Sequence, residues 1–378
     1  MDLTLNNAVL GVEITGIRQF TYLVRDTPGA CALTIGEPDF NTPDVVKEAA
    51  KAALDANDTH YPPGNGYPYM LEALSKFEAE RHGLHYAPEE IILTIGATEG
   101  LFIGMSTVLN PGDEIIIPTP AFGLYESMAR LLRGVPVPLP TEHNRFQVDP
   151  EALKAAITPK TKAIVLTSPN NPTGCIYTKE TLDGIHEVLK DKPIFVFCDD
   201  VYRELIYTED YHSFAEFQDM RDRIIVIQSF SKPYAMTGWR LGYCMADAPI
   251  RDRMQIFHQH SVVSAPSYVQ PACVAALQKD VSDVRDTFRK RRDYVYPRLR
   301  SMGLEVQEPE GAFYMFINIA KYGMDSETFC KKMLQEGKVG LIPGIYFGTE
   351  GYVRLSYCYS DADLKEGLDR VETFIKTL

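Results

Sequence analysis

Short apolar runs alternate with helical stretches through the middle of the chain. Six runs are rich in β-branched and other apolar residues: IILTIG (91–96), EIIIP (114–118), KAIVLTSP (162–169), IFVFCD (194–199), RIIVIQSFS (223–231) and RLGYCMA (240–246). Helical patterns such as LYESMARLLRG and KETLDGIHEVLKD lie between most of them. Nearly continuous apolar runs are typical of strands covered on both faces, and their alternation with helices predicts a mainly parallel α/β sheet.

The C-terminal part of the chain has a different pattern. A long charged helical stretch, DVRDTFRKRRDYVYPRLRSMG, is followed by LEVQEPEGAFYMFINI, a helix around SETFCKKMLQEG, the strand YVRLSYCY and the helix DADLKEGLDRVETFIKTL. Such a mixture predicts a smaller α+β unit beside the large sheet. We expect residues 44–290 to form a large domain and residues 291–378 a small one. Residues 1–43 would form an N-terminal arm that belongs in part to the small domain.

Composition and charge exclude several classes of partner. The 378 residues are 45% apolar and 24% charged, which is typical of a globular protein, and 38 basic against 51 acidic residues give a net charge of −13. Without a basic block, this charge argues against nucleic acid or an anionic membrane as the main partner, but it leaves room for a local anion site. The beginning, MDLTLNNAVLGVEITGIRQF, lacks a secretory signal pattern, and no run is long enough for a membrane helix.

The seven cysteines are scattered and form no CxxC pair. This pattern predicts reduced thiols in a cytoplasmic protein and no zinc site. Cys198, within an apolar run, is expected to be a small buried side chain.

Lys232 lies directly after an apolar run, in the segment SFSK, and Arg240 follows eight positions later. Open α/β sheets bind ligands at the carboxyl ends of their strands, so this segment could bring a nucleophilic amine and an anion-binding guanidinium together. The alternative interpretation is a surface lysine in a Ser-rich turn.

Three further polar segments follow predicted strands. Asn171 lies in SPNNPTG, Asp199 and Tyr202 follow IFVFC, and GATEG begins a helical pattern whose free N–H groups could bind a phosphate. Each also has a plain structural interpretation, as a turn, a helix cap or a strand-to-helix turn.

Together these motifs resemble the class I and II aminotransferases, the pyridoxal-phosphate enzymes of fold type I. The resemblance runs from IGEPDFNTP (35–43) through YPPGNGYP, GATEG, PNNPTG, DDVY and SFSKxxxMTGWRLG to GYVRLSY. Within the family, TGIRQF, MTGWRLG and GYVRLS followed by KEGLDR are most similar to the subgroup of aspartate, aromatic and acetyl-diaminopimelate aminotransferases. The resemblance implies a seven-stranded, mainly parallel sheet, a smaller α+β domain and pyridoxal 5′-phosphate as cofactor.

The resemblance also assigns roles around the cofactor ring. Lys232 would form the Schiff base and carry a proton, and Asp199 would pair with the pyridine nitrogen. Tyr202 and Asn171 would donate hydrogen bonds to the phenolic oxygen, and Phe122, in PTPAFGLY, would stack on the ring.

At the phosphate, Ala97 and Thr98 would donate backbone N–H groups, Ser229 and Thr98 hydroxyls, and Arg240 a charged fork. Ser231 lies in the same turn. Tyr61, in HYPPGNGYP, would reach the phosphate in the other subunit, which implies a homodimer with active sites at the interface.

For the substrate, Arg354 would clamp the α-carboxylate, helped by Asn171 and by a close approach of the backbone at Gly36. The implied reaction is ping-pong transfer of the amino group of an L-amino acid, such as aspartate, an aromatic or a related one, to a 2-oxo acid. A carbon–sulfur β-lyase on the same scaffold is the alternative function.

Five positions depart from the family pattern or could carry other chemistry. Thr98 stands where an aspartate-specific subgroup has a lysine for the distal carboxylate, and Tyr346 replaces a small residue. Arg18, in GIRQF, is interpreted as part of a surface ion pair on a helix, with a place near the substrate entrance as the alternative. His258 and His260 form the closest histidine pair, but no carboxylate or cysteine cluster supports a metal there.

Overall fold

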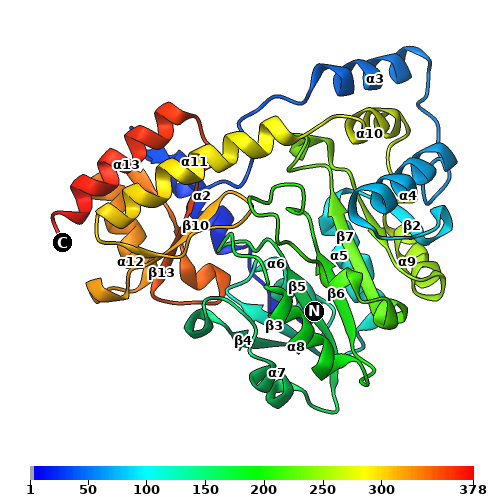
Figure 1. Cartoon of the computed structure of the whole chain (residues 1–378), viewed down its shortest axis with the longest axis horizontal. Coiled ribbons are helices and arrows are strands. Elements are labelled where there is room, and N and C mark those ends of the chain that lie inside the picture. Colours follow the sequence, from blue (N-terminus) through cyan, green and yellow to red (C-terminus); the bar gives the residue numbers. More distant parts are fainter. Residues whose placement is uncertain (1–3) are drawn as a thin grey trace.

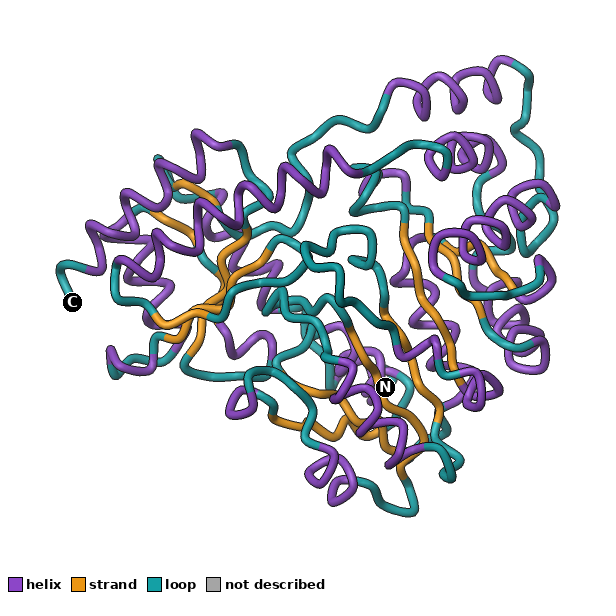
Figure 2. The backbone as a smooth tube through the Cα atoms, viewed as in Figure 1, coloured by secondary structure: helices purple, strands orange, loops and turns teal. Residues whose placement is uncertain are grey.

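A computed structural model describes residues 4–378 of the chain. A seven-stranded sheet forms the core of one half of the molecule, and a four-stranded sheet forms the core of the other (Figures 1 and 2). The 20-residue helix α11 (Ser282–Ser301) runs from the large half to the small one, and both halves carry helices on their outside.

The large sheet has the strand order β2-β8-β7-β6-β5-β3-β4. Its strands are β2 (Ile91–Thr94), β8 (Gly242–Met245), β7 (Ile224–Ser229), β6 (Phe195–Asp199), β5 (Thr161–Thr167), β3 (Glu114–Thr119) and β4 (Val135–Pro140). Only β8 runs against its neighbours: it pairs antiparallel with β2 and β7, and the other pairs are parallel. The prediction of a mainly parallel α/β sheet is therefore confirmed.

The hydrophobic pattern of the sequence did not predict strand β4. Its sequence, VPVPLP, holds three prolines, which lack the N–H that a central strand needs. The strand lies at the edge of the sheet, where it pairs only with β3.

The helices follow the predicted order. The expected stretches form α6 (Leu124–Leu131), α8 (Lys179–Leu189), α11, α12 (Ser326–Lys332) and α13 (Asp361–Ile375). The others are α1 (Asn7–Leu10), α2 (Gly16–Arg25), α3 (Asp44–Asp55), α4 (Pro68–His82), α5 (Gly96–Val108), α7 (Pro150–Ala156), α9 (Ala248–Ser261) and α10 (Gln270–Leu277). None of the helices described for residues 4–378 has the length and hydrophobicity to cross a membrane.

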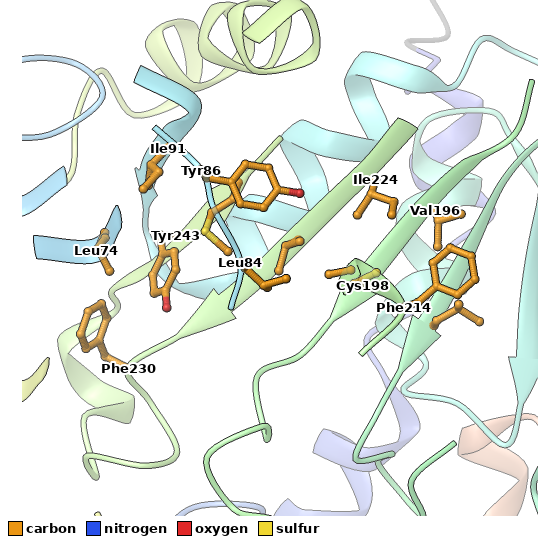
Figure 3. Close-up of a cluster of buried hydrophobic side chains, with 14 of the residues drawn as sticks. Leu74, Leu84, Tyr86, Ile91, Val196, Cys198, Phe214, Ile224, Phe230 and Tyr243 are labelled. Carbon is orange, nitrogen blue, oxygen red and sulfur yellow. The ribbon is translucent and has the colours of Figure 1, made fainter. Parts of the chain in front are cut away.

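Both faces of the large sheet are buried. In β6, Val196 and Cys198 belong to one apolar cluster, whereas Phe197 between them belongs to a second cluster on the other face. Figure 3 shows Cys198 among the side chains of the first cluster, and its exposed fraction of 1% confirms the expectation of a small buried residue. Helices α4, α7, α8 and α10 contribute to the first cluster, and α5, α6 and α9 to the second.

The smaller half contains residues from both the N-terminal and the C-terminal segments of the chain. Its antiparallel sheet has the order β12 (Ile342–Pro343), β13 (Tyr352–Ser356), β10 (Tyr314–Asn318) and β9 (Glu305–Val306). In addition, β1 (Cys31–Ala32) pairs with β11 (Val339–Gly340), and Phe20 and Val24 share the core of the C-terminal residues. This packing supports a composite small domain, although the boundaries at residues 43 and 290 stay predictions, and residues 1–3 lie outside the described part.

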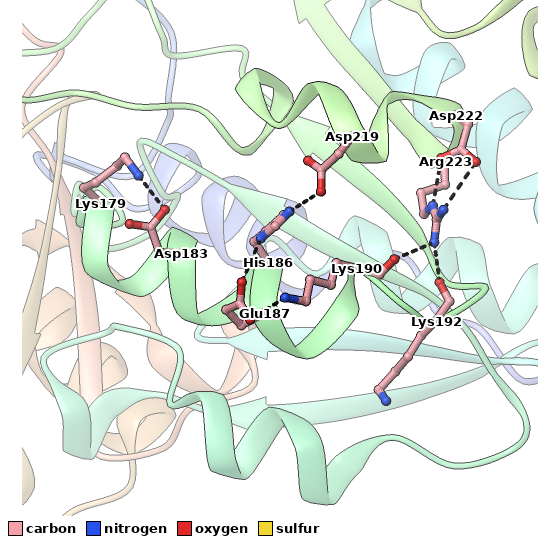
Figure 4. Close-up of polar contacts among 9 residues, drawn as sticks. All are labelled: Lys179, Asp183, His186, Glu187, Lys190, Lys192, Asp219, Asp222 and Arg223. Carbon is pink, nitrogen blue, oxygen red and sulfur yellow. Dashed lines mark hydrogen bonds and ion pairs between the residues drawn. The ribbon is translucent and has the colours of Figure 1, made fainter.

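Polar contacts fasten the end of α8 to the segment that leads into β7 (Figure 4). His186 Nε2 lies 2.7 Å from Asp219 Oδ2, and Arg223 Nη1 donates to the carbonyls of Lys190 and Lys192 at 3.3 and 2.7 Å. Because the last carbonyls of a helix have no partner within it, a guanidinium there stabilises the helix end. These contacts help to fix β7, the strand that leads to Lys232.

Candidate active site

Six of the seven strands of the large sheet end at the same edge. Strand β2 is antiparallel to β8, which is antiparallel to β7, so β2 runs in the direction of the other five. A cavity of about 550 Å³ opens at this edge. It is lined by eleven of the twelve site residues expected from the sequence: Gly36, Ala97, Thr98, Phe122, Asn171, Asp199, Tyr202, Ser229, Lys232, Arg240 and Arg354.

Lys232 follows the end of β7, and its side chain is partly buried in the cavity wall. The Nζ atom donates a hydrogen bond to the carbonyl of Gly36 at 2.7 Å. Burial lowers the pKa of the amine to about 8, and the nearby guanidinium groups of Arg354 and Arg240 act in the same direction. The neutral, nucleophilic form of this amine is therefore accessible closer to neutral pH than that of an ordinary lysine.

Asp199 ends β6 and is buried, with an exposed fraction of 4%. Its Oδ2 accepts a hydrogen bond of 2.6 Å from the hydroxyl of Tyr125, which lies 2.8 Å from Thr167 Oγ1. Its Oδ1 is buried without a hydrogen-bond partner in the described chain. Burial raises the pKa of the carboxyl group to about 6. Oδ1 is therefore an acceptor that a ligand with a buried donor would satisfy.

In a second part of the cavity, at the start of helix α5, several N–H donors lie close together. Helix α5 begins at Gly96, directly after β2, so the N–H groups of Ala97 and Thr98 belong to its first turn. The guanidinium of Arg240 packs against Gly96: a Cβ atom at that position would lie 2.6 Å from Arg240 Nη2. The N-terminus of this 13-residue helix, beside an exposed arginine, is suited to bind a phosphate.

We expect Gly96→Ala to weaken binding of a phosphate group at this helix start about tenfold or more, because the new methyl group would push Arg240 away from it. The glycine also has a φ of +70°, which L-residues rarely adopt. The dissociation constant of pyridoxal phosphate, the cofactor that the sequence resemblance implies, measures the effect on the apoprotein. Gly112→Ala is the matched control, because Gly112 has a φ of +88° but a methyl group added there would have no atom within 4 Å, and the residue has no place in the cavity. Equal losses in both variants would contradict this explanation.

Arg354, in β13, is buried at the side of the cavity formed by the small half. Nη1 donates to Asn171 Oδ1 at 2.9 Å and Nη2 to the carbonyl of Thr34 at 2.5 Å, whereas Nε has no partner in the described residues. The rings of Tyr314 and Phe347 lie 4.6 and 4.8 Å from its Cζ. The guanidinium is thus held in place with donors to spare, as a carboxylate-binding arginine must be.

Tyr202 and Phe122 complete the walls. The hydroxyl of Tyr202 lies 2.8 Å from that of Tyr314, and its ring is 6.0 Å from Lys232 Nζ. Phe122 packs edge-on against Tyr125, with ring centroids 6.2 Å apart. Ser231, beside Lys232, donates its N–H to Ser229 Oγ at 3.0 Å and also lines the cavity.

Tyr61 is the expected site residue that the structure does not bring to the cavity of its own chain. Its side chain is 89% exposed. Tyr346 also lies outside the cavity lining and donates to Glu327 at 2.6 Å. His258 lies in α9, where its ring contacts Glu99 and the carbonyl of Gly64, and residues 4–378 hold no metal-ligand cluster.

The preferred interpretation of Arg18 was wrong. This residue lies in α2 and lines the cavity, and it makes no ion pair with any residue of the described chain. An exposed arginine on an amphipathic helix has the same sequence pattern whether it faces bulk water or a cavity, so only the packing of α2 distinguishes the two.

Several cavity residues were missed because they act through other side chains. Tyr125 donates to Asp199 and is itself bonded to Thr167, and Tyr314 holds Tyr202 and faces Arg354. Tyr125 could have been found from its place in the PTPAFGLY segment, three residues after Phe122 and in the first turn of the helix that follows. No local pattern identifies Tyr314.

Comparisons with known proteins agree with this arrangement. The family model for aminotransferase class I and II matches residues 30–371. The chain is 41% identical to a probable N-acetyl-LL-diaminopimelate aminotransferase of Bacillus subtilis, over 99% of this chain and 96% of the relative. It is 38% identical to an aspartate aminotransferase of Pyrococcus abyssi, over 97% of this chain and 96% of that protein. The solved structure of aspartate aminotransferase from Thermus thermophilus with maleate superimposes with a TM-score of 0.94 at 33% identity, covering 100% of both chains.

The protein is thus an α/β transferase enzyme whose cavity combines an amine, a carboxylate and the N–H donors of a helix start. The chain belongs to the class I and II aminotransferases. Its cofactor is pyridoxal 5′-phosphate, and its substrates are amino acids and oxo acids.

Proposed function

We propose that this aminotransferase moves the amino group of an L-amino acid to a 2-oxo acid in a ping-pong reaction, with aspartate, aromatic or related amino acids as donors. The observation that carries this proposal is the meeting of Lys232, Asp199 and Arg354 in one cavity. They supply a nucleophilic amine, a buried carboxylate with a free oxygen and a guanidinium with free donors. The names of the relatives support the range of donors.

The cavity residues fit pyridoxal phosphate. When bound, this cofactor supplies a carbonyl carbon that reacts with amines and a protonated ring that accepts electrons. The free Oδ1 of Asp199 is suited to accept the hydrogen bond of the ring nitrogen. The N–H groups of Ala97 and Thr98, the hydroxyl of Ser229 and the fork of Arg240 are suited to hold the phosphate. The Phe122 ring, also at the cavity wall, is suited to cover one face of the cofactor.

The remaining residues orient the substrate and the reacting groups. Arg354 would bind the α-carboxylate, with Asn171 fixing its guanidinium and the backbone of Gly36 close by. Tyr202 would donate to the phenolic oxygen of the cofactor, since its hydroxyl already lies in the cavity wall. Lys232, once free, would take the proton from Cα of the substrate and return it to the neighbouring carbon, because an amine with a pKa of about 8 can accept and release a proton near neutral pH.

We also propose a homodimer in which Tyr61 completes the site of the partner subunit. Tyr61 is 89% exposed and stands apart from its own cavity. Exposed apolar residues lie on the segments around it: Leu54, Val262, Val263 and Tyr268. These segments touch each other, since Ser267 Oγ donates to the carbonyl of Asp58 at 2.7 Å. Sedimentation of the holoenzyme tests the dimer.

The cytoplasmic location expected from the cysteines stays a prediction.

Single half-reactions test the proposed function. Each L-amino acid of a panel is mixed with the holoenzyme without an oxo acid, and the visible absorption of the cofactor and the released oxo acid are followed. We expect one equivalent of oxo acid per site for a good donor, and recovery of the original spectrum when a second oxo acid is added, as ping-pong kinetics require. Release of pyruvate and a thiol from cystathionine, without amino transfer to any oxo acid, would instead identify a β-lyase.

A further inference from the structure

The ring of His258 is fully buried, and both of its nitrogens face acceptors. Nδ1 lies 2.7 Å from Glu99 Oε1, and Nε2 lies 2.8 Å from the carbonyl oxygen of Gly64. A carbonyl oxygen can only accept, so Nε2 carries a proton, and the short contact with the carboxylate requires a second proton between Nδ1 and Oε1. Wherever that proton lies between these two atoms, the pair of His258 and Glu99 has no net charge.

This pair lies beside the helix start that is suited to bind a phosphate. Glu99 is in the first turn of α5, one position after Thr98, and its Oε2 accepts a hydrogen bond of 2.5 Å from the N–H of Ile95, the residue before the helix. Ala97 and Thr98 line the cavity, whereas Glu99 does not. The side chain of Glu99 is only 9% exposed, so water screens its charge little.

An unpaired carboxylate at this position would weaken phosphate binding. The N-terminus of a helix attracts anions, and a negative side chain in its first turn uses part of this attraction and repels a second anion. Within residues 4–378, His258 is the one ion-pair partner of Glu99. The proton that the two side chains share is therefore what removes a negative charge from the helix start.

The surroundings of His258 hold its ring in this orientation. Helix α9, which carries His258, packs against α5. The loop that contains Gly64 is attached on both sides: the carbonyl of Asn65 accepts the N–H of Leu93 in β2 at 3.0 Å, and a Cβ atom at Gly64 would lie 3.0 Å from Gln255 Nε2 in α9. The bond from Nε2 to the Gly64 carbonyl thus leaves Nδ1 directed at Glu99.

We infer that His258 is a positioning residue for the cofactor phosphate: through the proton that it shares with Glu99, it keeps the start of α5 free of a net negative charge. The inference rests on the proposed function for the place of the phosphate. His258 does not line the cavity, so its replacement should affect only those ligands that carry a phosphate group.

The test measures binding of inorganic phosphate, pyridoxal phosphate and pyridoxal to the full-length apoprotein. His258→Gln keeps a donor for the Gly64 carbonyl but has no proton to share with Glu99. We expect it to bind the two phosphate ligands about three- to thirtyfold more weakly, and pyridoxal, which lacks the phosphate, within about twofold of wild type. His186→Gln is the matched control: His186 also contacts a carboxylate at 2.7 Å, but that partner, Asp219, lies in the segment before β7.

Removal of the carboxylate should reverse the effect. In the double variant Glu99→Gln/His258→Gln no charge remains at the helix start, so the affinity for inorganic phosphate should return to within about threefold of wild type. Loss of packing alone would not produce this recovery. Glu99→Gln by itself should bind phosphate at least as tightly as wild type, and this measurement does not depend on the folding of His258→Gln.

These binding measurements separate the inference from the proposed function, because they do not involve amino transfer. If no amino acid reacts with the holoenzyme but the phosphate affinities change as expected, the proposed function fails and the role of His258 stands. The inference is overturned if His258→Gln binds phosphate like wild type or loses pyridoxal to the same extent. It is also overturned if the double variant shows no recovery or if Glu99→Gln binds phosphate more weakly than wild type.

Discussion

Lys232→Ala is expected to abolish amino transfer, with kcat lower by at least about 10⁴-fold, because the variant loses the side chain that we propose as both nucleophile and proton carrier. The yellow colour of the holoenzyme should disappear as well. The fold should be retained: burial already lowers the pKa of this amine, so removal of the side chain removes a desolvation cost as well as the bond to the Gly36 carbonyl. Steady-state kinetics, visible spectra and thermal denaturation of the same preparation measure these three effects.

Two further variants make this result specific to the amine. Lys232→Arg keeps a positive charge, but a guanidinium does not lose its proton, so this variant should be as inactive as the alanine variant. Lys331→Ala removes a surface lysine that pairs with Glu327, and its activity should equal that of the wild type. Normal amino transfer by either Lys232 variant would refute the assignment of this residue.

Asp199→Asn is expected to lower kcat/KM at least about a hundredfold, because an amide cannot keep the cofactor ring nitrogen protonated. The same substitution should increase the stability of the apoprotein above pH 6. Burial raises the pKa of Asp199 from its ordinary value to about 6, so the ionised group lowers the stability of the apoprotein above pH 6. A shift of this size corresponds to a free energy on the order of 3 kcal/mol.

The sign of the pH dependence distinguishes this explanation from simple damage to the fold. The raised pKa means that Asp199 contributes stability only where it is protonated, below its unfolded pKa, and that this contribution is lost as the pH rises through about 6. The amide introduced by Asp199→Asn does not titrate, so the variant apoprotein should be more stable than wild type at pH 8, and the difference should vanish near pH 4. Denaturant unfolding at several pH values measures it. A variant that is less stable at pH 8 would contradict the proposed cost of burial.

Asp200→Asn serves as the control for Asp199→Asn. Asp200 is the next residue, is equally buried and has a pKa raised to about 6 by burial, but it accepts a hydrogen bond from Ser213 and does not line the cavity. Its replacement should leave the spectrum of the bound cofactor unchanged.

The sequence alone was sufficient where one local pattern determines one structure. The apolar runs that end at Asp199 and near Lys232 predicted β6 and β7, and strand direction then brought both residues to one edge. Strand β4 was missed because its three prolines remove the β-strand pattern, and an edge position, which makes them tolerable, is a property of the whole sheet.

The sequence predicted the residues that would touch the cofactor or the substrate. It did not predict most of the residues that hold those side chains in position. Asp199 and Arg354 lie in motifs, whereas Tyr125 and the Thr34 carbonyl meet them only through tertiary packing. Arg18 illustrates the same limit. Whether an exposed arginine is a solvated surface group or part of a cavity wall depends on the neighbours of its helix, which lie more than 300 positions away at β12.

The contact between Arg354 and the Thr34 carbonyl spans 320 positions of the chain, and β1 and β11 are joined over a similar separation. Such long-range contacts form late, because the intervening chain must first be ordered. During synthesis, the N-terminal residues leave the ribosome first but have to wait for β11 and β13 before they can pack. The large sheet is complete by residue 245, so it can form earlier, with its own edge of the cavity exposed. The proposed substrate site is thus the last part of the cavity that the growing chain completes, and loss of the last strands would remove Arg354, the proposed carboxylate clamp, from the edge of the large sheet.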